Sequence, residues 1–134
     1  MTGLVQPVVR EITQSQIDAY AAASGDDNPI HVDPAFAATT PFGGTIAHGM
    51  LVLALIGEMM HDAHGEAWRN SGRLKVRFKA PTRAGDTVTA SATPSKPSDG
   101  TQEYAVQCAN QHGEILIEGR ASVSEDGRRR PSSS

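Results

Sequence analysis

The chain of 134 residues carries 12 Lys and Arg against 15 Asp and Glu, which gives a formal net charge of -3 at pH 7. A chain of this length is expected to form one domain with its own core, and its weak negative charge argues against general nucleic-acid binding. The single cysteine, Cys108, cannot form an intrachain disulfide, which favours a reducing compartment. No segment has the ~18 consecutive apolar residues of a membrane helix, and the opening MTGLVQPVVREI lacks the features of a signal peptide. We therefore expect a cytoplasmic protein that binds neither nucleic acid nor membrane.

The N-terminal quarter predicts a short strand and an amphipathic helix. Residues 8–12 suit a strand, and Thr13 begins a capping box for a helix over residues 14–23. Gly25 is well placed to end that helix, because glycine adopts a positive φ at little cost.

A second helix start leads toward one long apolar segment. Asp33 can cap free amide groups and Pro34 suits the first helical position, which predicts a helix of one or two turns. From about residue 48 to 61 the chain is apolar on nearly every side, which is typical of a helix that is buried all round. Such a helix requires other elements to cover it.

The second half of the chain supplies these elements as alternating strands. Polar and apolar residues alternate in four segments, near residues 73–79, 87–93, 104–108 and 114–124. Pro-rich, Gly-rich or Asn-rich turns separate these segments. The order predicts an α+β domain over residues 1–124, in which a curved antiparallel sheet wraps around the long helix. The last residues, 125–134 (EDGRRRPSSS), predict a disordered polar tail. Pairing with a second copy would remove the edges of so small a sheet.

A polar turn before the long helix carries the candidate acid–base chemistry. Asp26 and His31 flank the sequence Asp27-Asn28-Pro29, whose turn chemistry can bring together two residues that an extended chain would separate by up to about 17 Å. A carboxylate and an imidazole that both reach one water molecule form an acid–base pair, because histidine exchanges protons near neutral pH. The same residues also make an ordinary turn, so the spacing alone leaves both interpretations open.

The start of the long helix is a candidate oxyanion site. A helix N-terminus presents free amide groups and a partial positive charge, and Gly49 has no side chain to block its N–H from a substrate carbonyl. A purely structural interpretation, in which Gly49 permits close helix packing, also stands.

The histidines and the cysteine admit other interpretations. His31, Asp33 and His48, or His61 and His64 at i, i+3, could bind a metal, but no tight ligand signature accompanies them. The sequence favours a solvated helix end for His61 and His64. Cys108 lies on an alternating strand and is expected to be a small core residue rather than a nucleophile.

The polar turn and the segment that follows it also carry a family resemblance. The stretch SGDDNPIHVDPAFAATTPFGGTIAHGM resembles the signature of the MaoC-like, (R)-specific enoyl-CoA hydratases of the hot-dog superfamily, and KVRFKAPTRAGDTV downstream carries the resemblance through nearly the whole chain. The resemblance implies a hot-dog fold, in which a curved sheet wraps one helix, and a homodimer with one continuous sheet.

The resemblance also implies roles for individual residues. Asp26 and His31 match the catalytic pair, Gly49 the oxyanion-hole amide, and Asn28 is expected to orient the pair or the substrate water. The implied reaction adds water to a trans-2-enoyl thioester to give an (R)-3-hydroxyacyl thioester, or removes it. The substrate is a thioester of coenzyme A or of a carrier protein, and no cofactor or metal is implied.

Three further features bear on substrate choice. Phe36 and Phe42 either line the acyl pocket or simply pack in the core, and Gly57 leaves room for the acyl chain.

The alternatives to a hydratase are a hot-dog acyl thioesterase, which would release a free thiol, and a non-catalytic subunit that binds acyl thioesters.

Overall fold

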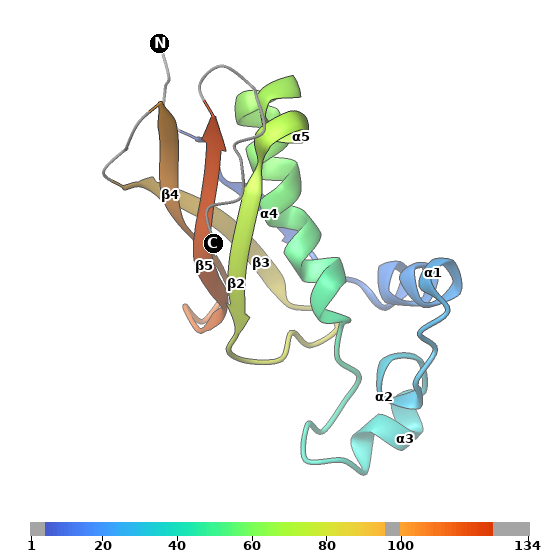
Figure 1. The fold of residues 1–134 in the computed structure, drawn as a ribbon. Coiled ribbons are helices and arrows are strands. Elements are labelled where there is room, and N and C mark those ends of the chain that lie inside the picture. The colour runs from blue at the N-terminus through green and yellow to red at the C-terminus, as the bar shows by residue number, and fades with distance from the viewer. Residues whose placement is uncertain (1–4, 96–99, 125–134) are drawn as a thin grey trace.

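The computed structural model describes residues 5–95 and 100–124, which form a five-stranded antiparallel sheet with a long helix packed across one face (Figure 1). In chain order the elements are β1 (Val8–Glu11), α1 (Gln14–Ser24), α2 (Pro29–Val32), α3 (Pro34–Ala38), α4 (Gly49–His64), α5 (Glu66–Ser71), β2 (Arg73–Phe78), β3 (Thr87–Pro94), β4 (Thr101–Ala109) and β5 (Ile115–Ser124). The strand order is β1-β3-β4-β5-β2. The predicted tail, residues 125–134, lies outside the described residues. So do residues 96–99, most of the turn expected between the strands near residues 87–93 and 104–108.

The alternating pattern of the strands places one apolar set against α4. Ala90 of β3 pairs with Cys108 of β4, which in turn pairs with Ile117 of β5. All three are buried in the core. Since side chains along a strand alternate between the two faces, this register turns the polar neighbours to the opposite face. The predicted α+β class and the strand segments are confirmed.

Helix α4 is buried on one side rather than all round. Val52, Ile56 and Met59 are almost fully buried, whereas Met50 is 57% exposed and Ala54 is exposed. The sheet covers only the side that faces β1, β3 and β4. The prediction of a helix buried on all sides is therefore wrong for the single chain, because an apolar composition does not say how many faces have a neighbour.

Helices α1, α2 and α3 lie beyond the N-terminal end of α4, apart from the sheet (Figure 1). The Thr13 hydroxyl accepts from the Gln16 amide, and Gly25 ends α1 with a φ of 81°, as predicted. Asp33 caps α3 as predicted. Helix α2 was not predicted: the polar turn continues into this short helix, which Asn28 caps.

Two features after α4 also differ from the predictions. Helix α5 is not anticipated by the sequence pattern and begins where Gly65 turns the chain with a φ of 56°. Phe78, in the alternating apolar set of β2, is 53% exposed. Phe78 is the last residue of β2, an edge strand, and although its backbone pairs with Ile117 of β5, its ring is not covered by the core.

Cys108 is fully buried, and burial raises the pKa of its thiol to about 12. This agrees with the predicted core role. Among the described residues, no helix combines the length and the apolar character that crossing a bilayer requires.

Candidate active site

Helix α2 sets the position of His31. The Asn28 side chain accepts from the Ile30 amide and so caps this four-residue helix, with Pro29 at its first position. The Gln14 side chain, from α1, donates to the His31 carbonyl oxygen at 2.8 Å. It also accepts from the Thr45 hydroxyl at 2.6 Å. Gln14 therefore ties α1, α2 and the loop before α4 together.

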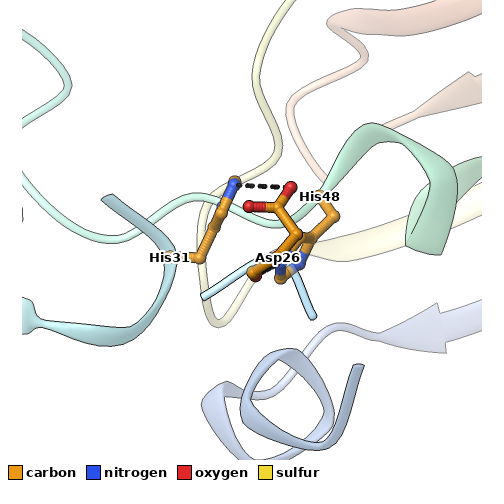
Figure 2. Close-up of side chains that lie close together, drawn as sticks. All are labelled: Asp26, His31 and His48. Carbon is orange, nitrogen blue, oxygen red and sulfur yellow. Dashed lines mark hydrogen bonds and ion pairs between the residues drawn. The ribbon is translucent and has the colours of Figure 1, made fainter. Parts of the chain in front are cut away.

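The structure brings Asp26 and His31 together (Figure 2). His31 Nε2 and Asp26 Oδ2 lie 3.9 Å apart. The His31 side chain is 12% exposed and that of Asp26 is 58% exposed. The gap is too long for a direct hydrogen bond, but two hydrogen bonds of about 2.8 Å from one water molecule can span it.

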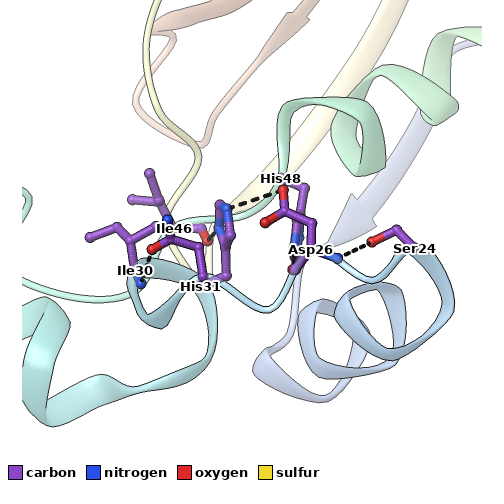
Figure 3. A network of polar contacts seen from close by, with 7 residues as sticks. Ser24, Asp26, Ile30, His31, Ile46 and His48 are labelled. Atoms are coloured by element: carbon purple, nitrogen blue, oxygen red, sulfur yellow. Dashed lines mark hydrogen bonds and ion pairs between the residues drawn. The ribbon is translucent and has the colours of Figure 1, made fainter.

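The hydrogen bond made by His31 Nδ1 determines that Nε2 is the ring nitrogen left to accept a hydrogen bond. His31 Nδ1 lies 2.8 Å from the carbonyl oxygen of Ile46 (Figure 3). A carbonyl only accepts, so Nδ1 carries the hydrogen and Nε2 of the neutral ring has a free lone pair toward Asp26. The Ile46 amide donates in turn to the Ile30 carbonyl at 3.1 Å. These two bonds hold the loop before α4 against α2.

His48, directly before α4, lies against both members of the pair. Its ring stacks on that of His31, with centroids 3.8 Å apart and 23° between planes. Its Nε2 donates to the backbone carbonyl of Asp26 at 2.7 Å. His48 is only 4% exposed.

A cavity of about 380 Å³ lies beside Gly49, at the N-terminal end of α4. Its walls are largely apolar and include Phe42, Val52, Phe78 and Ile117. The Gly49 N–H belongs to the first helical turn, where amide groups have no intrahelical partner. A Cβ at this position would come within 2.8 Å of the Phe78 ring, so a side chain here would displace that ring.

A larger open hollow, about 620 Å³, lies on the outer face of the sheet. Its lining includes Lys75, Arg77 and Arg120 and no histidine. Its charged walls do not suit an acyl chain, so the smaller apolar cavity is the better candidate for substrate.

The arrangement does not suit the metal site that the sequence left open. Asp33, one predicted ligand, instead accepts from the Phe36 amide at 3.1 Å as a helix cap. One ring nitrogen of each of His31 and His48 and one Asp26 oxygen do lie within 4.8 Å of one another. A metal must lie in the plane of each ring, about 2.1 Å from its nitrogen. The two rings are stacked nearly parallel, so their lone pairs do not converge on one point.

The remaining residues named in the sequence analysis lie only in part where they were expected. Phe42 lines the cavity, whereas Phe36 is 46% exposed and is absent from its lining. A Cβ on Gly57 would meet nothing within 4 Å. His61 is exposed as predicted, but His64 is not a solvated end residue: its Nε2 hydrogen-bonds the Tyr104 hydroxyl at 2.9 Å.

Sequence reasoning missed the contacts of His48 and Gln14. The sequence pattern suggested His48 only as a metal ligand and Gln14 only as part of a helix start. The position of His48 next to Gly49 was a signal that it would lie at the site. No local signal links Gln14 to His31, because the bond depends on how α1 packs against α2.

Fold and site together define a class of protein: an α+β domain with one long helix on a curved sheet, and an acid–base pair beside an apolar cavity at the start of that helix. The profile of the MaoC like domain family matches residues 2–114. The chain belongs to this family, and the resemblance found in the sequence is confirmed.

Named relatives and solved structures agree with this assignment. The chain is 43% identical over 86 residues to the 3-hydroxyacyl-thioester dehydratase Z of Mycobacterium tuberculosis, an alignment that covers 61% of this chain and 57% of that protein. It is 35% identical over 127 residues to the (R)-specific enoyl-CoA hydratase of Rhodospirillum rubrum, covering 90% of this chain and 85% of that protein.

The structure of the (R)-hydratase from A. caviae involved in PHA biosynthesis matches with a TM-score of 0.78 and 29% identity, covering 91% of this chain and 96% of that one. The fold is therefore the hot-dog fold of the (R)-hydratases, as the resemblance implied.

Proposed function

We propose that this protein adds water to trans-2-enoyl thioesters to form (R)-3-hydroxyacyl thioesters, and catalyses the reverse dehydration. The observation that carries this proposal is the 3.9 Å gap between the Asp26 carboxylate and His31 Nε2, the ring nitrogen that does not bond the Ile46 carbonyl. The names of the relatives from Rhodospirillum and Mycobacterium, a hydratase and a dehydratase, support the two directions of one reaction.

In the proposed mechanism, the pair holds the water and transfers its protons. Asp26 and His31 Nε2 each accept one hydrogen bond from the water, which directs its oxygen to the β-carbon. As the C–O bond forms, one of the two groups accepts a proton from the water. A proton is then delivered to the α-carbon on the same face, so the pair returns to its starting state and one water is added. Dehydration follows the same steps in reverse.

Gly49 stabilises the charge that develops on the substrate. Attack at the β-carbon moves electron density onto the thioester oxygen, which becomes enolate-like. The Gly49 N–H, at the positive end of the α4 dipole, is the proposed donor to that oxygen. Loss of one such donor costs about 10²–10³ in kcat in other enzymes. In this scheme, Asn28 orients the pair by capping α2, which carries His31.

The apolar cavity beside Gly49 is the proposed acyl site, and the substrate is a thioester of coenzyme A or of a carrier protein. The reaction as written requires neither a metal ion nor an organic cofactor. Incubation with EDTA should therefore leave the hydration rate unchanged, and loss of activity that Zn²⁺ restores would contradict the mechanism. We also propose that the protein works in the cytoplasm.

We propose that the working unit is a homodimer with a continuous sheet. Met50 on the open face of α4 and Phe78 beside Gly49 are 57% and 53% exposed, and β1 and β2 are the sheet edges. A second copy could cover this apolar surface and pair an edge. Sedimentation equilibrium should give twice the mass of one chain. Met50→Glu should weaken the dimer, whereas the control Ala23→Glu, on the exposed side of α1, should not. A monomer at micromolar concentration would overturn this part.

The activity itself is tested with crotonyl-CoA. Hydration removes the enoyl-thioester absorbance and releases no thiol, whereas a thioesterase would release one. Asp26→Asn should lower kcat by about 10²–10⁴-fold. The matched control is Asp27→Asn, which changes an adjacent exposed carboxylate. Chiral analysis should find the (R) product. Wild-type hydration by Asp26→Asn, or thiol release without hydration, would refute the assignment.

A further inference from the structure

The buried ring of His48 takes no part in the mechanism above, although it contacts both members of the acid–base pair. It lies directly before α4 and is 4% exposed. Among the described residues, its Nδ1 is the buried side-chain nitrogen that has no hydrogen-bond partner. Buried polar atoms are nearly always satisfied, so an exception beside a candidate active site requires an explanation.

The first contact of His48 fixes Asp26. The Asp26 amide donates to the Ser24 hydroxyl at 3.2 Å, a bond within the same turn. The Asp26 carbonyl accepts from His48 Nε2 at 2.7 Å, across 22 positions of the chain. The second bond therefore anchors the exposed turn that carries the carboxylate to the start of α4 (Figure 3).

The second contact fixes His31. The stacked rings, 3.8 Å apart, limit the rotation of the His31 imidazole about its own side chain. The Tyr20 ring packs against His48 as well, with centroids 4.8 Å apart. Through one hydrogen bond and one ring contact, His48 thus constrains both groups whose separation the reaction depends on.

These contacts also determine opposite tautomers in the two stacked rings. His48 Nε2 bonds a carbonyl and therefore carries a hydrogen, so in the neutral ring Nδ1, which has no partner, carries none. His31 carries its hydrogen on Nδ1, toward Ile46. In this arrangement both proton-carrying nitrogens are committed to backbone carbonyls, and His31 Nε2 remains free for water.

We infer that His48 is a positioning residue of this site. Its Nε2–H bond and its ring stack hold the Asp26 carboxylate and the His31 ring at the separation that the reaction requires. It acts through these two residues and does not contact substrate. The inference rests on the proposed hydration, and it makes separate predictions for the hydrogen bond and for the stack.

Two variants separate the two contacts. His48→Gln keeps a donor close to the place of Nε2 but loses the ring, whereas His48→Phe keeps a ring but loses the donor. Each should lower kcat for crotonyl-CoA by about 10- to 100-fold, the loss that small misplacements of catalytic groups produce. KM should change by less than about threefold, because His48 does not line the cavity. His61→Gln, at an exposed histidine of α4, is the matched control and should keep the wild-type kcat.

A second measurement does not depend on activity. In ¹⁵N-histidine-labelled protein, the ring signals lost in His48→Gln should show the Nε2–H tautomer, and those lost in His31→Asn the Nδ1–H tautomer. In His48→Phe, which removes the anchor of Asp26, the His31 signals should shift. Thermal unfolding of each variant identifies any that do not fold.

The outcomes distinguish this inference from the proposed function. Wild-type kcat in both folded His48 variants, or an Nδ1–H tautomer at His48, would overturn the positioning role. If the wild-type protein hydrates no enoyl thioester, the proposed function fails, and the tautomers and the His31 shift still decide whether His48 positions the pair. If His48→Phe does not fold, His48→Gln and the wild-type spectrum decide.

Discussion

The two ends of helix α4 each carry a buried or half-buried histidine, but their surroundings differ. At the C-terminal end, His64 donates to the Tyr104 hydroxyl, which donates to Gln102 at 2.8 Å. At the N-terminal end, His48 donates to the Asp26 backbone while its second nitrogen has no partner. At the C-terminal end, the Tyr104 hydroxyl thus both accepts and donates a hydrogen bond within the protein, whereas at the N-terminal end His48 Nδ1 has no partner.

This difference agrees with the proposed roles of the two ends, a structural contact at His64 and catalysis at Asp26 and His31. Burial lowers the pKa of His64 and raises the pKa of Tyr104, so both groups are kept neutral in the fold. At the other end, Asp26 stays in contact with solvent and His31 Nε2 faces it across a gap that water can fill. A site that must receive and return a proton cannot have all its acceptors occupied by the protein.

Removing the free nitrogen at the N-terminal end should have the largest effect. His31→Asn keeps a donor near the position of Nδ1, toward Ile46, and deletes Nε2. Hydration of crotonyl-CoA should fall by about 10²–10⁴-fold in kcat, because one member of the acid–base pair is lost. The same change at the other end, His64→Asn, should leave kcat near that of the wild type. Comparable losses in both variants would contradict the contrast between the two ends.

Breaking the hydrogen bonds from His64 to Tyr104 and from Tyr104 to Gln102 should instead lower stability. Tyr104→Phe removes the acceptor of His64 and the donor to Gln102, so the free energy of unfolding should fall by about 1–2 kcal/mol. For a chain of this size, that corresponds to a drop in Tm of about 5 °C. Urea unfolding and the hydration assay, run on the same samples, check both halves of the prediction. A stable variant with reduced kcat would place this end in the catalytic machinery.

The smallest effect is expected between the two ends, where a partly exposed residue of α4 contacts the edge strand β1. Arg10 of β1 forms two hydrogen bonds with Glu58, at 2.7 and 2.8 Å, and the hydrogen bond from Arg10 lowers the Glu58 pKa from its usual value of 4.5. The two side chains are 41% and 40% exposed. Screening by solvent therefore limits the contribution of this ion pair to the free energy of unfolding to about 0.2–1 kcal/mol.

The pH dependence of this pair has a defined sign. The stabilisation by ionised Glu58 is complete above pH 4.5 and is lost as the pH falls through the lowered pKa of the folded state. Glu58→Gln should therefore be less stable than the wild type at pH 7, and the two proteins should converge on acidification. Urea titrations at several pH values measure this difference. A difference that grows in acid would show that the ion pair is not its cause.

Local patterns were sufficient for most of the fold. Period-two alternation placed the strands, and Thr13, Gly25 and Asp33 marked helix ends because their capping bonds span only a few residues. The ordered motif around Asp26 and His31 led to the family. Contacts between distant segments, such as that of His64 with Tyr104 across 40 positions, left no such local signal.

Residue type and short spacing were enough to predict an α+β domain with a candidate acid–base turn before an apolar helix, and the resemblance carried by that motif led to the MaoC-like family. Three other features emerged only from the folded chain: α4 leaves one face open, Phe78 lies over Gly49, and His48 joins Asp26 to His31. Each of these results from how far-apart segments pack, because a residue's chemistry does not specify which neighbours the fold brings to it.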